Sequence, residues 1–236
     1  MSVRLLVLED DDGIRTSVTM ALEDEGYEVT GHPSAEEALR DPSLGEVDLH
    51  LVDLMLGGMD GYSFIREVRR RSDVPIIVLS AKGDTHDIVA ALEAGADDYV
   101  TKPFEIKEVS ARLRALRRRP PTRSAEQTAD APDVVVLDAE NGPLVLDTGA
   151  AVLRRGEEVV HLTVTEYHLL RELAASAGRV LSRQVLLERV WDHGYFGDER
   201  IVDVHVRRLR TKVEVTASDP RLVVTVRGLG YRLDPQ

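Results

Sequence analysis

Carboxylates, a hydroxyl and a lysine follow short aliphatic runs in the first half of the chain. Glu9 and Asp10 come after VRLLVL, Asp53 ends HLVD, Ser80 ends PIIVLS and Lys102 follows DDYVT. Neighbouring carboxylates repel when ionised unless a hard cation lies among them, and Mg²⁺ prefers such oxygen ligands. A carboxylate can also accept a phosphoryl group as an aspartyl-phosphate, whose oxygens need a metal, an ammonium and a hydroxyl as partners. These residue types therefore predict phosphoryl transfer to Asp53 with the help of Mg²⁺.

These side chains converge only if the aliphatic runs form neighbouring strands. Runs such as LLVL and IIVL are apolar on both faces, which suits central parallel strands covered by helices. The alternation of such runs with amphipathic stretches predicts a doubly wound α/β sheet of five strands. In the flavodoxin-like order 2-1-3-4-5, strands 1 and 3 flank the edge where ligands bind, so Glu9, Asp10 and Asp53 would meet there. The expected strands are 3–8, 27–30, 48–52, 75–79 and 98–100, and the expected helices are 13–25, 35–40, 61–71, 85–94 and 107–119.

The pattern changes after a linker at 120–132, PPTRSAEQTADAP, which has almost no apolar bulk and no periodicity. Short runs separated by the turn signals AENG, DTG and RRGEE predict an antiparallel sheet over 134–162. Helices are expected at 165–177, 182–190 and 199–213, followed by a hairpin of 222–226 and 231–233. The predicted domains are therefore 1–119 and 133–236.

The last predicted helix is basic, although the chain as a whole has a net charge of −12. Residues 200–212 contain five basic side chains and one acid. A basic helix that follows another helix is a helix-turn-helix candidate, with the second helix in the major groove of double-stranded DNA. Arg227 lies at a glycine-flanked hairpin tip, a position suited to the minor groove. Local charge therefore favours DNA binding where the net charge does not.

Composition excludes several other functions. Without cysteine the chain has no disulfides, thiolate metal sites or cysteine nucleophiles. No apolar run approaches the length of a membrane span, and the N-terminal residues lack the pattern of a signal peptide. We expect a cytoplasmic protein.

Residues 1–119 resemble the receiver domain of two-component response regulators in LVLEDD, LVDLMLGGMDG, VLSAK and GADDYVTKPF. The resemblance implies that Asp53 takes a phosphoryl group from a phosphohistidine on a sensor histidine kinase. It also implies that Lys102 is catalytic and that Ser80 and Tyr99 form a switch pair. The implied Mg²⁺ ligands are Asp10, Asp53 and the carbonyl of Met55, with Glu9 acting through water. Gly57 departs from the family, which usually has a proline there.

Residues 133–236 resemble the winged-helix effector domain of the OmpR/PhoB family, an α+β fold of four-stranded sheet, three helices and hairpin wing. The motifs are LTVTEYHLLRELAASAGRVLSRQVLLERVW, VDVHVRRLRTKVE and VTVRGLGYRL. The resemblance implies that residues 191–197 face RNA polymerase. It implies base contacts from Arg208 and Asp203 with help from Ile201 and Val204, phosphate contacts from Arg200, Arg207 and Arg210, and a minor-groove contact from Arg227.

The resemblance further implies a homodimer of the phosphorylated protein, which would place two winged helices on a repeated DNA site. The dimer face would comprise the fourth helix, fifth strand and fifth helix. Ile88 stands there where the family usually has a lysine. Asp97, Asp98 and Glu108 would face Arg112 and Arg119 of the partner.

Two alternatives to a phosphorylation-dependent transcriptional regulator remain open. An aspartyl-phosphate phosphatase would also use an aspartate at a strand end, but it usually needs a second one two residues on, where this chain has Met55. No phosphate-binding glycine loop supports an ATPase. The other alternative is a DNA-binding protein that works without phosphorylation and carries a vestigial receiver, against which the complete set of pocket residues argues. We therefore expect that the protein accepts a phosphoryl group but is not a turnover enzyme.

Overall fold

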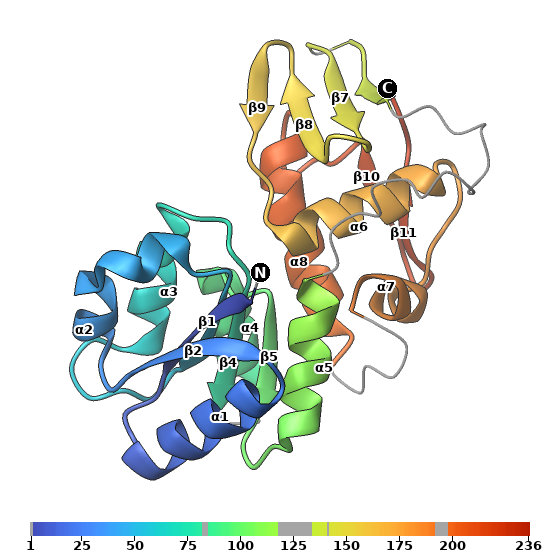
Figure 1. Cartoon of the computed structure of the whole chain (residues 1–236). Coiled ribbons are helices and arrows are strands. Elements are labelled where there is room, and N and C mark those ends of the chain that lie inside the picture. The colour runs from blue at the N-terminus through green and yellow to red at the C-terminus, as the bar shows by residue number, and fades with distance from the viewer. Residues whose placement is uncertain (1, 82–84, 118–133, 141, 192–197) are drawn as a thin grey trace. The chain divides into compact units, whose positions relative to one another are not determined.

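The computed structural model describes residues 2–81, 85–117, 134–140, 142–191 and 198–236, and these divide into two compact units (Figure 1). Unit 1 comprises Met1–Arg114 and unit 2 comprises Ala115–Gln236. The predicted linker at 120–132, Arg119 and most of the loop at 191–197 lie outside the described residues.

Unit 1 is built on a five-stranded parallel sheet with the order β2-β1-β3-β4-β5, which confirms the predicted fold and strand order. Every residue of β3 and β4 is buried, as the apolar run IIVL predicted for β4. The strands are β1 (Val3–Leu8), β2 (Tyr27–His32), β3 (Leu49–Asp53), β4 (Ile76–Ser80) and β5 (Asp98–Thr101).

Helices connect successive strands of this sheet, and α1, α2 and α3 begin at side-chain caps. The carboxylate of Asp11 accepts a hydrogen bond from the amide of Ile14 (2.8 Å), and Asp60 caps α3 in the same way through Ser63 (2.7 Å). Capping helps to fix each helix start close to the strand end before it, where the candidate site lies. The helices are α1 (Asp12–Asp24), α2 (Ala35–Arg40), the 3₁₀ turn η1 (Pro42–Glu46), α3 (Gly61–Arg69), α4 (Thr85–Ala94) and α5 (Ile106–Leu116).

Unit 2 begins with a four-stranded antiparallel sheet, continues with three helices and ends in a two-stranded hairpin. The order of elements is the predicted one. Its strands are β6 (Val134–Asp138), β7 (Leu144–Asp147), β8 (Val152–Arg155) and β9 (Glu158–Val160), its helices are α6 (Val164–Ala175), α7 (Arg183–Val190) and α8 (Arg200–Val213), and its hairpin consists of β10 (Val223–Val226) and β11 (Gly230–Leu233).

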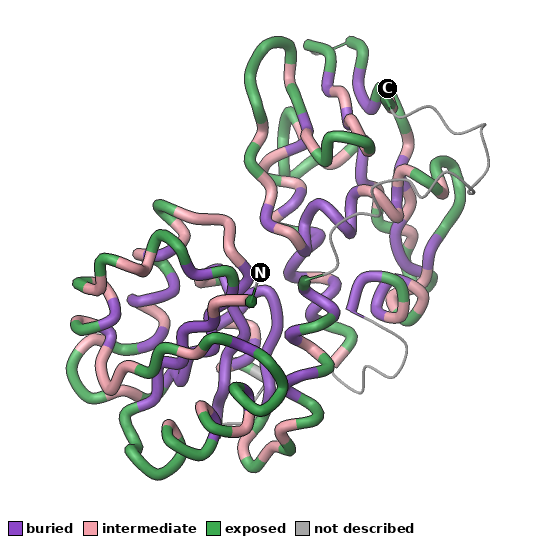
Figure 2. Tube along the Cα trace, in the orientation of Figure 1, coloured by how far each residue is buried: buried purple, intermediate pink, exposed green. Residues whose placement is uncertain are grey.

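Each unit has its own buried segments (Figure 2). Most of the buried core side chains are aliphatic, as the scarcity of aromatic residues requires. In unit 2, α6 contacts both α7 and α8, so the helices share one core. The hairpin joins that core because β11 contacts α6 and Tyr231 bridges to Leu181. Among the helices described, none combines the length and hydropathy that a bilayer crossing requires.

Candidate functional site

Three carboxylates gather at the carboxyl edge of the sheet in unit 1. β1 and β3 are adjacent, with Leu8 beside Val52, so the residues that follow β1 lie next to Asp53. Oxygen atoms of Glu9, Asp10 and Asp53 all lie within 4.8 Å of one another. Glu9 and Asp53 are buried, at 1% and 4% exposed, whereas Asp10 is exposed. The sheet therefore brings together the acidic residues that the sequence predicted would meet.

Lys102 provides the cation of this cluster. Its Nζ lies 2.6 Å from Glu9 Oε2 and 2.6 Å from Asp53 Oδ2. Its backbone amide donates to the carbonyl of Ser80 (2.7 Å), which anchors the residue at the end of β4. Burial opposes protonation of Lys102, but the hydrogen bonds to Asp53 and Glu9 outweigh it and hold its pKa above the usual value.

Burial raises the pKa of Glu9, and the charge of Asp53 adds to that effect although Lys102 opposes it. The cluster thus contains three carboxylates, two of them buried, and one ammonium, which contacts the two buried ones. Such an excess of negative charge is costly by itself and is the environment in which a divalent cation binds through oxygen ligands. The donor set fits a Mg²⁺ ion.

The remaining predicted pocket residues lie at the ends of neighbouring elements. Ser80 ends β4 and is buried at 3% exposed, and Tyr99 lies in the adjacent β5 with its side chain buried. The amide of Met55 donates to Asp53 Oδ1 (3.0 Å), and the Met55 side chain is exposed.

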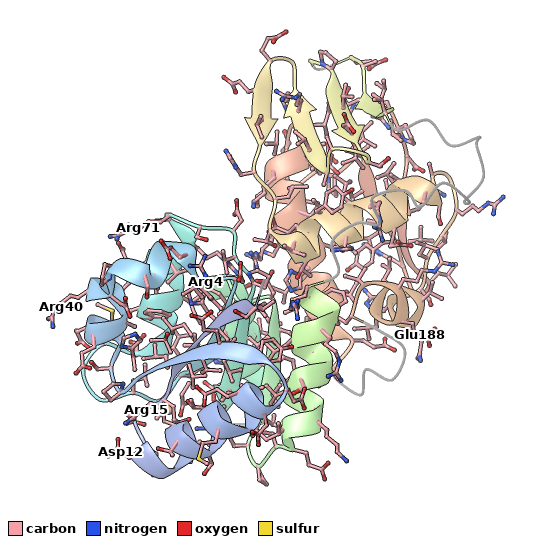
Figure 3. All side chains as sticks on the ribbon, viewed as in Figure 1. Arg4, Asp12, Arg15, Arg40, Arg71 and Glu188 are labelled. Atoms are coloured by element: carbon pink, nitrogen blue, oxygen red, sulfur yellow. The ribbon has the colours of Figure 1, made fainter. Side chains whose placement is uncertain are left out.

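Strand β3 and helix α3 approach each other closely. A Cβ on Gly61 would lie 2.3 Å from the backbone oxygen of Asp53, so only glycine fits at this position. Arg15 of α1 donates to the carbonyl oxygen of Glu9 (2.8 Å) and pairs with the exposed Asp12 (Figure 3). The backbone around the carboxylates therefore contacts two helices, α3 at Asp53 and α1 at Glu9.

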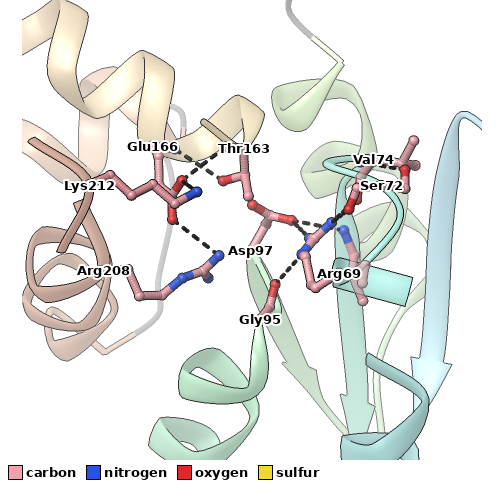
Figure 4. Close-up of polar contacts among 10 residues, drawn as sticks. Arg69, Ser72, Val74, Gly95, Asp97, Thr163, Glu166, Arg208 and Lys212 are labelled. Atoms are coloured by element: carbon pink, nitrogen blue, oxygen red, sulfur yellow. Dashed lines mark hydrogen bonds and ion pairs between the residues drawn. The ribbon is translucent and has the colours of Figure 1, made fainter. Parts of the chain in front are cut away.

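Among the charged residues expected at a dimer face, those that the structure describes are paired within unit 1, and Arg119 lies outside the described residues. Arg112 contacts Asp98 (3.1 Å) and Glu108 (2.7 Å). Asp97 pairs with Arg69 and also accepts from the amide of Ile76 at 3.0 Å (Figure 4). A dimer that used these charges between subunits would have to exchange or share the internal pairs.

On α8 of unit 2, some of the residues predicted to contact DNA are exposed, and others are buried or contact residues of the same unit. The side chain of Arg200 is 57% exposed, and Arg207 is also exposed. Ile201 and Val204, by contrast, are buried at 0% and 6% exposed. Arg208 contacts the buried carboxylate of Glu166 on α6.

Glu166 links α6 to the candidate recognition helix α8. Its carboxylate lies 2.6 Å from Lys212 Nζ and 3.2 Å from Arg208 (Figure 4). The same carboxylate accepts from the amide of Thr163, which completes a capping box at the start of α6. Glu166 was not among the predicted site residues, although the spacing of Thr163 and Glu166 is a capping-box signal.

A second network joins α8 to α7 and to the hairpin. Asp203 Oδ1 accepts from Arg183 Nε (2.7 Å) and from the Tyr231 hydroxyl (2.6 Å). Arg210 donates to the carbonyl of Val223 (2.9 Å) and lies over the Tyr231 ring. Burial, followed by the hydrogen bond to Asp203, raises the pKa of Tyr231 to about 12.

Asp203 and Arg210 therefore form hydrogen bonds that connect α8 to other elements of unit 2. Their predicted role was DNA binding. Arg227, in contrast, is exposed beside Gly228 at the hairpin tip. Helical periodicity could not have predicted the hydrogen bond between Asp203 and Tyr231, because the two residues are 28 positions apart.

An acidic pocket at the carboxyl edge of a parallel sheet, followed in the same chain by a helix-turn-helix with a hairpin wing, defines a receiver domain coupled to a DNA-binding effector. Residues 5–114 match the family model for the response regulator receiver domain, and residues 156–233 match that for the C-terminal domain of transcriptional regulatory proteins. The chain belongs to the OmpR/PhoB family of two-component response regulators. It acts as a transcriptional regulator through its winged-helix domain and is not a turnover enzyme, which confirms both predictions.

Relatives match the chain over nearly its whole length. It is 44% identical to the transcriptional regulatory protein AfsQ1 of Streptomyces coelicolor, with 98% of each chain covered. It is 41% identical to the DNA-binding response regulator MtrA of Mycolicibacterium smegmatis, with 100% of this chain and 98% of MtrA covered.

Two solved structures resemble the whole chain. A RitR mutant has a TM-score of 0.71 at 27% identity, with full coverage of both chains. DrrB of Thermotoga maritima, an OmpR/PhoB homologue, has a TM-score of 0.52 at 28% identity, with 99% of this chain and 100% of DrrB covered. Family membership implies a histidine kinase partner and DNA binding.

Proposed function

We propose that Asp53 accepts a phosphoryl group from the phosphohistidine of a sensor kinase. The observation that carries this proposal is the paired environment of its carboxylate: Lys102 lies 2.6 Å from one oxygen, and the other accepts from Met55. The Asp53 oxygen forms a bond to phosphorus as the phosphorus–nitrogen bond of the donor breaks. Lys102 lies where it can offset the charge of the transferring oxygens.

Mg²⁺ is the proposed cofactor. Asp10, Asp53 and the carbonyl of Met55 would hold it directly, and Glu9 would act through water. When bound, the ion supplies further positive charge to the phosphoryl oxygens. The Ser80 hydroxyl would then donate a hydrogen bond to the phosphoryl group, and Tyr99 on the adjacent strand would move with it as the second part of the switch. The buried positions of Ser80 and Tyr99 support this pairing.

Incubating the full chain with Mg²⁺ and a small acyl phosphate, followed by peptide mapping, tests the proposal. We expect one phosphoryl group per chain, on the peptide that contains Asp53. A phosphorylated peptide elsewhere would reject Asp53 as the acceptor. DNA binding without any incorporation would favour a vestigial receiver.

The proposed DNA contacts are the exposed cationic side chains of unit 2 that were predicted to bind DNA. Arg200 and Arg207 on α8 would bind phosphates, and Arg227 would enter the minor groove. Arg208 and Asp203, the predicted base contacts, could reach DNA only by sharing their present partners Glu166, Arg183 and Tyr231. Arg210, predicted to bind phosphate, already donates to the hairpin. Ile201 and Val204 are buried and do not support a base contact.

The proposed assembly retains the boundaries 1–119 for the receiver, 120–132 for the linker and 133–236 for the effector in a cytoplasmic protein. Phosphorylation would favour a homodimer through the face of α4, β5 and α5, with RNA polymerase contacting residues 191–197. Two copies of unit 2 would then bind repeated half-sites. Sizing the protein with and without beryllofluoride tests the dimer, and a monomer in both conditions would reject it.

Replacing Arg227 with alanine should weaken binding to DNA of any sequence and lower the salt dependence of log K by about one charge. The reason is that Arg227 is an exposed cation at the hairpin tip. Fluorescence anisotropy over a range of salt concentrations measures both quantities. Arg221→Ala removes an exposed arginine that precedes β10, away from the tip, and should leave the salt slope unchanged. Equal slopes for Arg227→Ala and the unsubstituted protein would contradict the tip contact.

A further inference from the structure

The loop that follows Asp53 contains a weakly constrained stretch. Residues 54–60 join β3 to α3 and include the adjacent glycines Gly57 and Gly58. Glycine loses more backbone entropy on ordering than any other residue. Within the described structure, the backbone amides of Leu56, Gly57 and Gly58 donate no hydrogen bond to protein. The loop must nevertheless keep its shape, because Met55 lies on it beside Asp53.

Glu36, on α2, contacts the middle of this loop. Its Oε1 accepts a hydrogen bond from the amide of Met59 at 2.9 Å, although the two residues are 23 positions apart. A Cβ built on Gly58 would lie 2.9 Å from the same oxygen, and Gly58 has a φ of 85°. The carboxylate therefore lies directly against the loop, beside a residue whose positive φ favours glycine.

The local chemistry keeps this carboxylate ionised. A hydrogen bond from its own backbone amide and a second from Met59 lower the pKa of Glu36. Glu36 also lies in the first turn of α2, where the helix dipole favours an anion. Hydrogen bonds to charged groups are stronger than those between neutral groups.

Both ends of the loop have separate attachments. The amide of Met55 donates to the acceptor Asp53 itself, and Asp60 caps α3. Among the described residues, the bond from Met59 to Glu36 is the side-chain attachment that lies between those two. Its loss would leave Leu56 to Met59 without a hydrogen bond to the rest of unit 1.

We propose that Glu36 is a positioning residue for the phosphoacceptor loop: by holding the amide of Met59, it fixes the path of a diglycine segment and so keeps Met55 beside Asp53. The proposal rests on the proposed role of Asp53 as phosphoryl acceptor. It gives α2, which contributes no residue to the pocket, a part in Mg²⁺ binding.

Amide hydrogen exchange of the full chain without Mg²⁺ or phosphate tests the hydrogen bond directly. In Glu36→Ala, the peptide covering residues 54–60 should exchange roughly tenfold faster than in the unsubstituted protein. Glu36→Gln retains an oxygen acceptor and should restore part of the protection. Glu37→Ala is the matched control, since Glu37 is its exposed neighbour on α2 and its side chain makes no bond to the loop. Equal exchange in Glu36→Ala and Glu37→Ala would overturn the proposal.

Calorimetric titration with Mg²⁺ tests the functional consequence. Glu36→Ala should raise the dissociation constant for Mg²⁺ several-fold, and Glu36→Gln should recover part of that loss. Adding Gly57→Pro should also restore affinity, because proline stiffens the loop. Gly57 can accept proline, since its amide is unbonded and its Cβ position is open.

Mg²⁺ affinity that is unchanged in Glu36→Ala would overturn the functional part of the proposal. Exchange and calorimetry need no phosphorylation. A faster-exchanging loop in a protein that never accepts phosphate on Asp53 would therefore reject the proposed function and leave the hydrogen bond to Glu36 in place.

Discussion

Replacing Asp53 with asparagine is expected to reduce phosphoryl incorporation from a small donor to the background of the assay. The amide nitrogen of asparagine cannot act as the nucleophile, and the variant keeps the fold because asparagine has the same shape and can still accept from Met55. Phosphate that survives in Asp53→Asn would reject the proposed acceptor. Phosphoryl incorporation into Asp53→Asn and into the unsubstituted protein is compared in the presence of excess Mg²⁺.

The same variant should also lose most of the stabilisation that Mg²⁺ provides. A ligand present at a hundred times its dissociation constant stabilises the folded state by about 2.7 kcal/mol. Asp53→Asn removes one of the three carboxylates that lie within 4.8 Å of one another, so thermal melting with and without Mg²⁺ should differ much less. Asp12→Asn is the control, because Asp12 is 88% exposed and lies outside the cluster (Figure 3). An undiminished Mg²⁺ effect in Asp53→Asn would place the ion elsewhere.

Replacing Glu166 with alanine is expected to destabilise unit 2 by about 3 kcal/mol, near the lower end of the cost of breaking a buried ion pair. The lower end applies because Arg208 and Lys212 keep some contact with water, with side chains 17% and 30% exposed. The change also removes one half of the capping box at Thr163. Trp191 is the only tryptophan of the chain and is buried in unit 2, so its fluorescence during denaturation reports on this unit.

Two further variants separate the causes of that loss. Glu166→Gln retains an acceptor for the capping box but removes the charge that faces Arg208 and Lys212. Glu188→Ala removes a carboxylate on α7 that accepts from Gln184 in the preceding turn, and it should cost less than about 1 kcal/mol (Figure 3). If the unfolding midpoints of Glu166→Ala and Glu188→Ala coincide, the ion pairs of Glu166 with Arg208 and Lys212 contribute no more to stability than the exposed Glu188 contact does.

The strand and helix positions could be predicted because they depend on local patterns. Aliphatic runs such as LLVL and IIVL became the buried parallel strands β1 and β4. The predicted ends of most elements lie within two residues of those in the structure, since caps such as Asp11 and Asp60 are encoded nearby. The receiver and winged-helix families were also predicted correctly from their motifs.

The interaction partners of the charged side chains on α8 could not be predicted from local patterns. Helical periodicity indicates which face a residue occupies, but the partner comes from a distant segment. Lys212 and Glu166 are 46 residues apart, and Arg210 reaches the hairpin 13 residues away. Arg208 and Asp203 therefore looked like free base contacts in the sequence and proved to have partners inside unit 2.

The sequence by itself determined the strand ends that carry Glu9, Asp53 and Lys102, because parallel strands bring their carboxyl ends to one edge whatever packs around them. Only the tertiary structure decided which charges are already neutralised: Lys102 by Glu9 and Asp53, Arg112 by Asp98, and Lys212 by Glu166. The reason is physical. An ion pair depends on distances of a few ångströms between segments that packing brings together, and no local pattern encodes such distances.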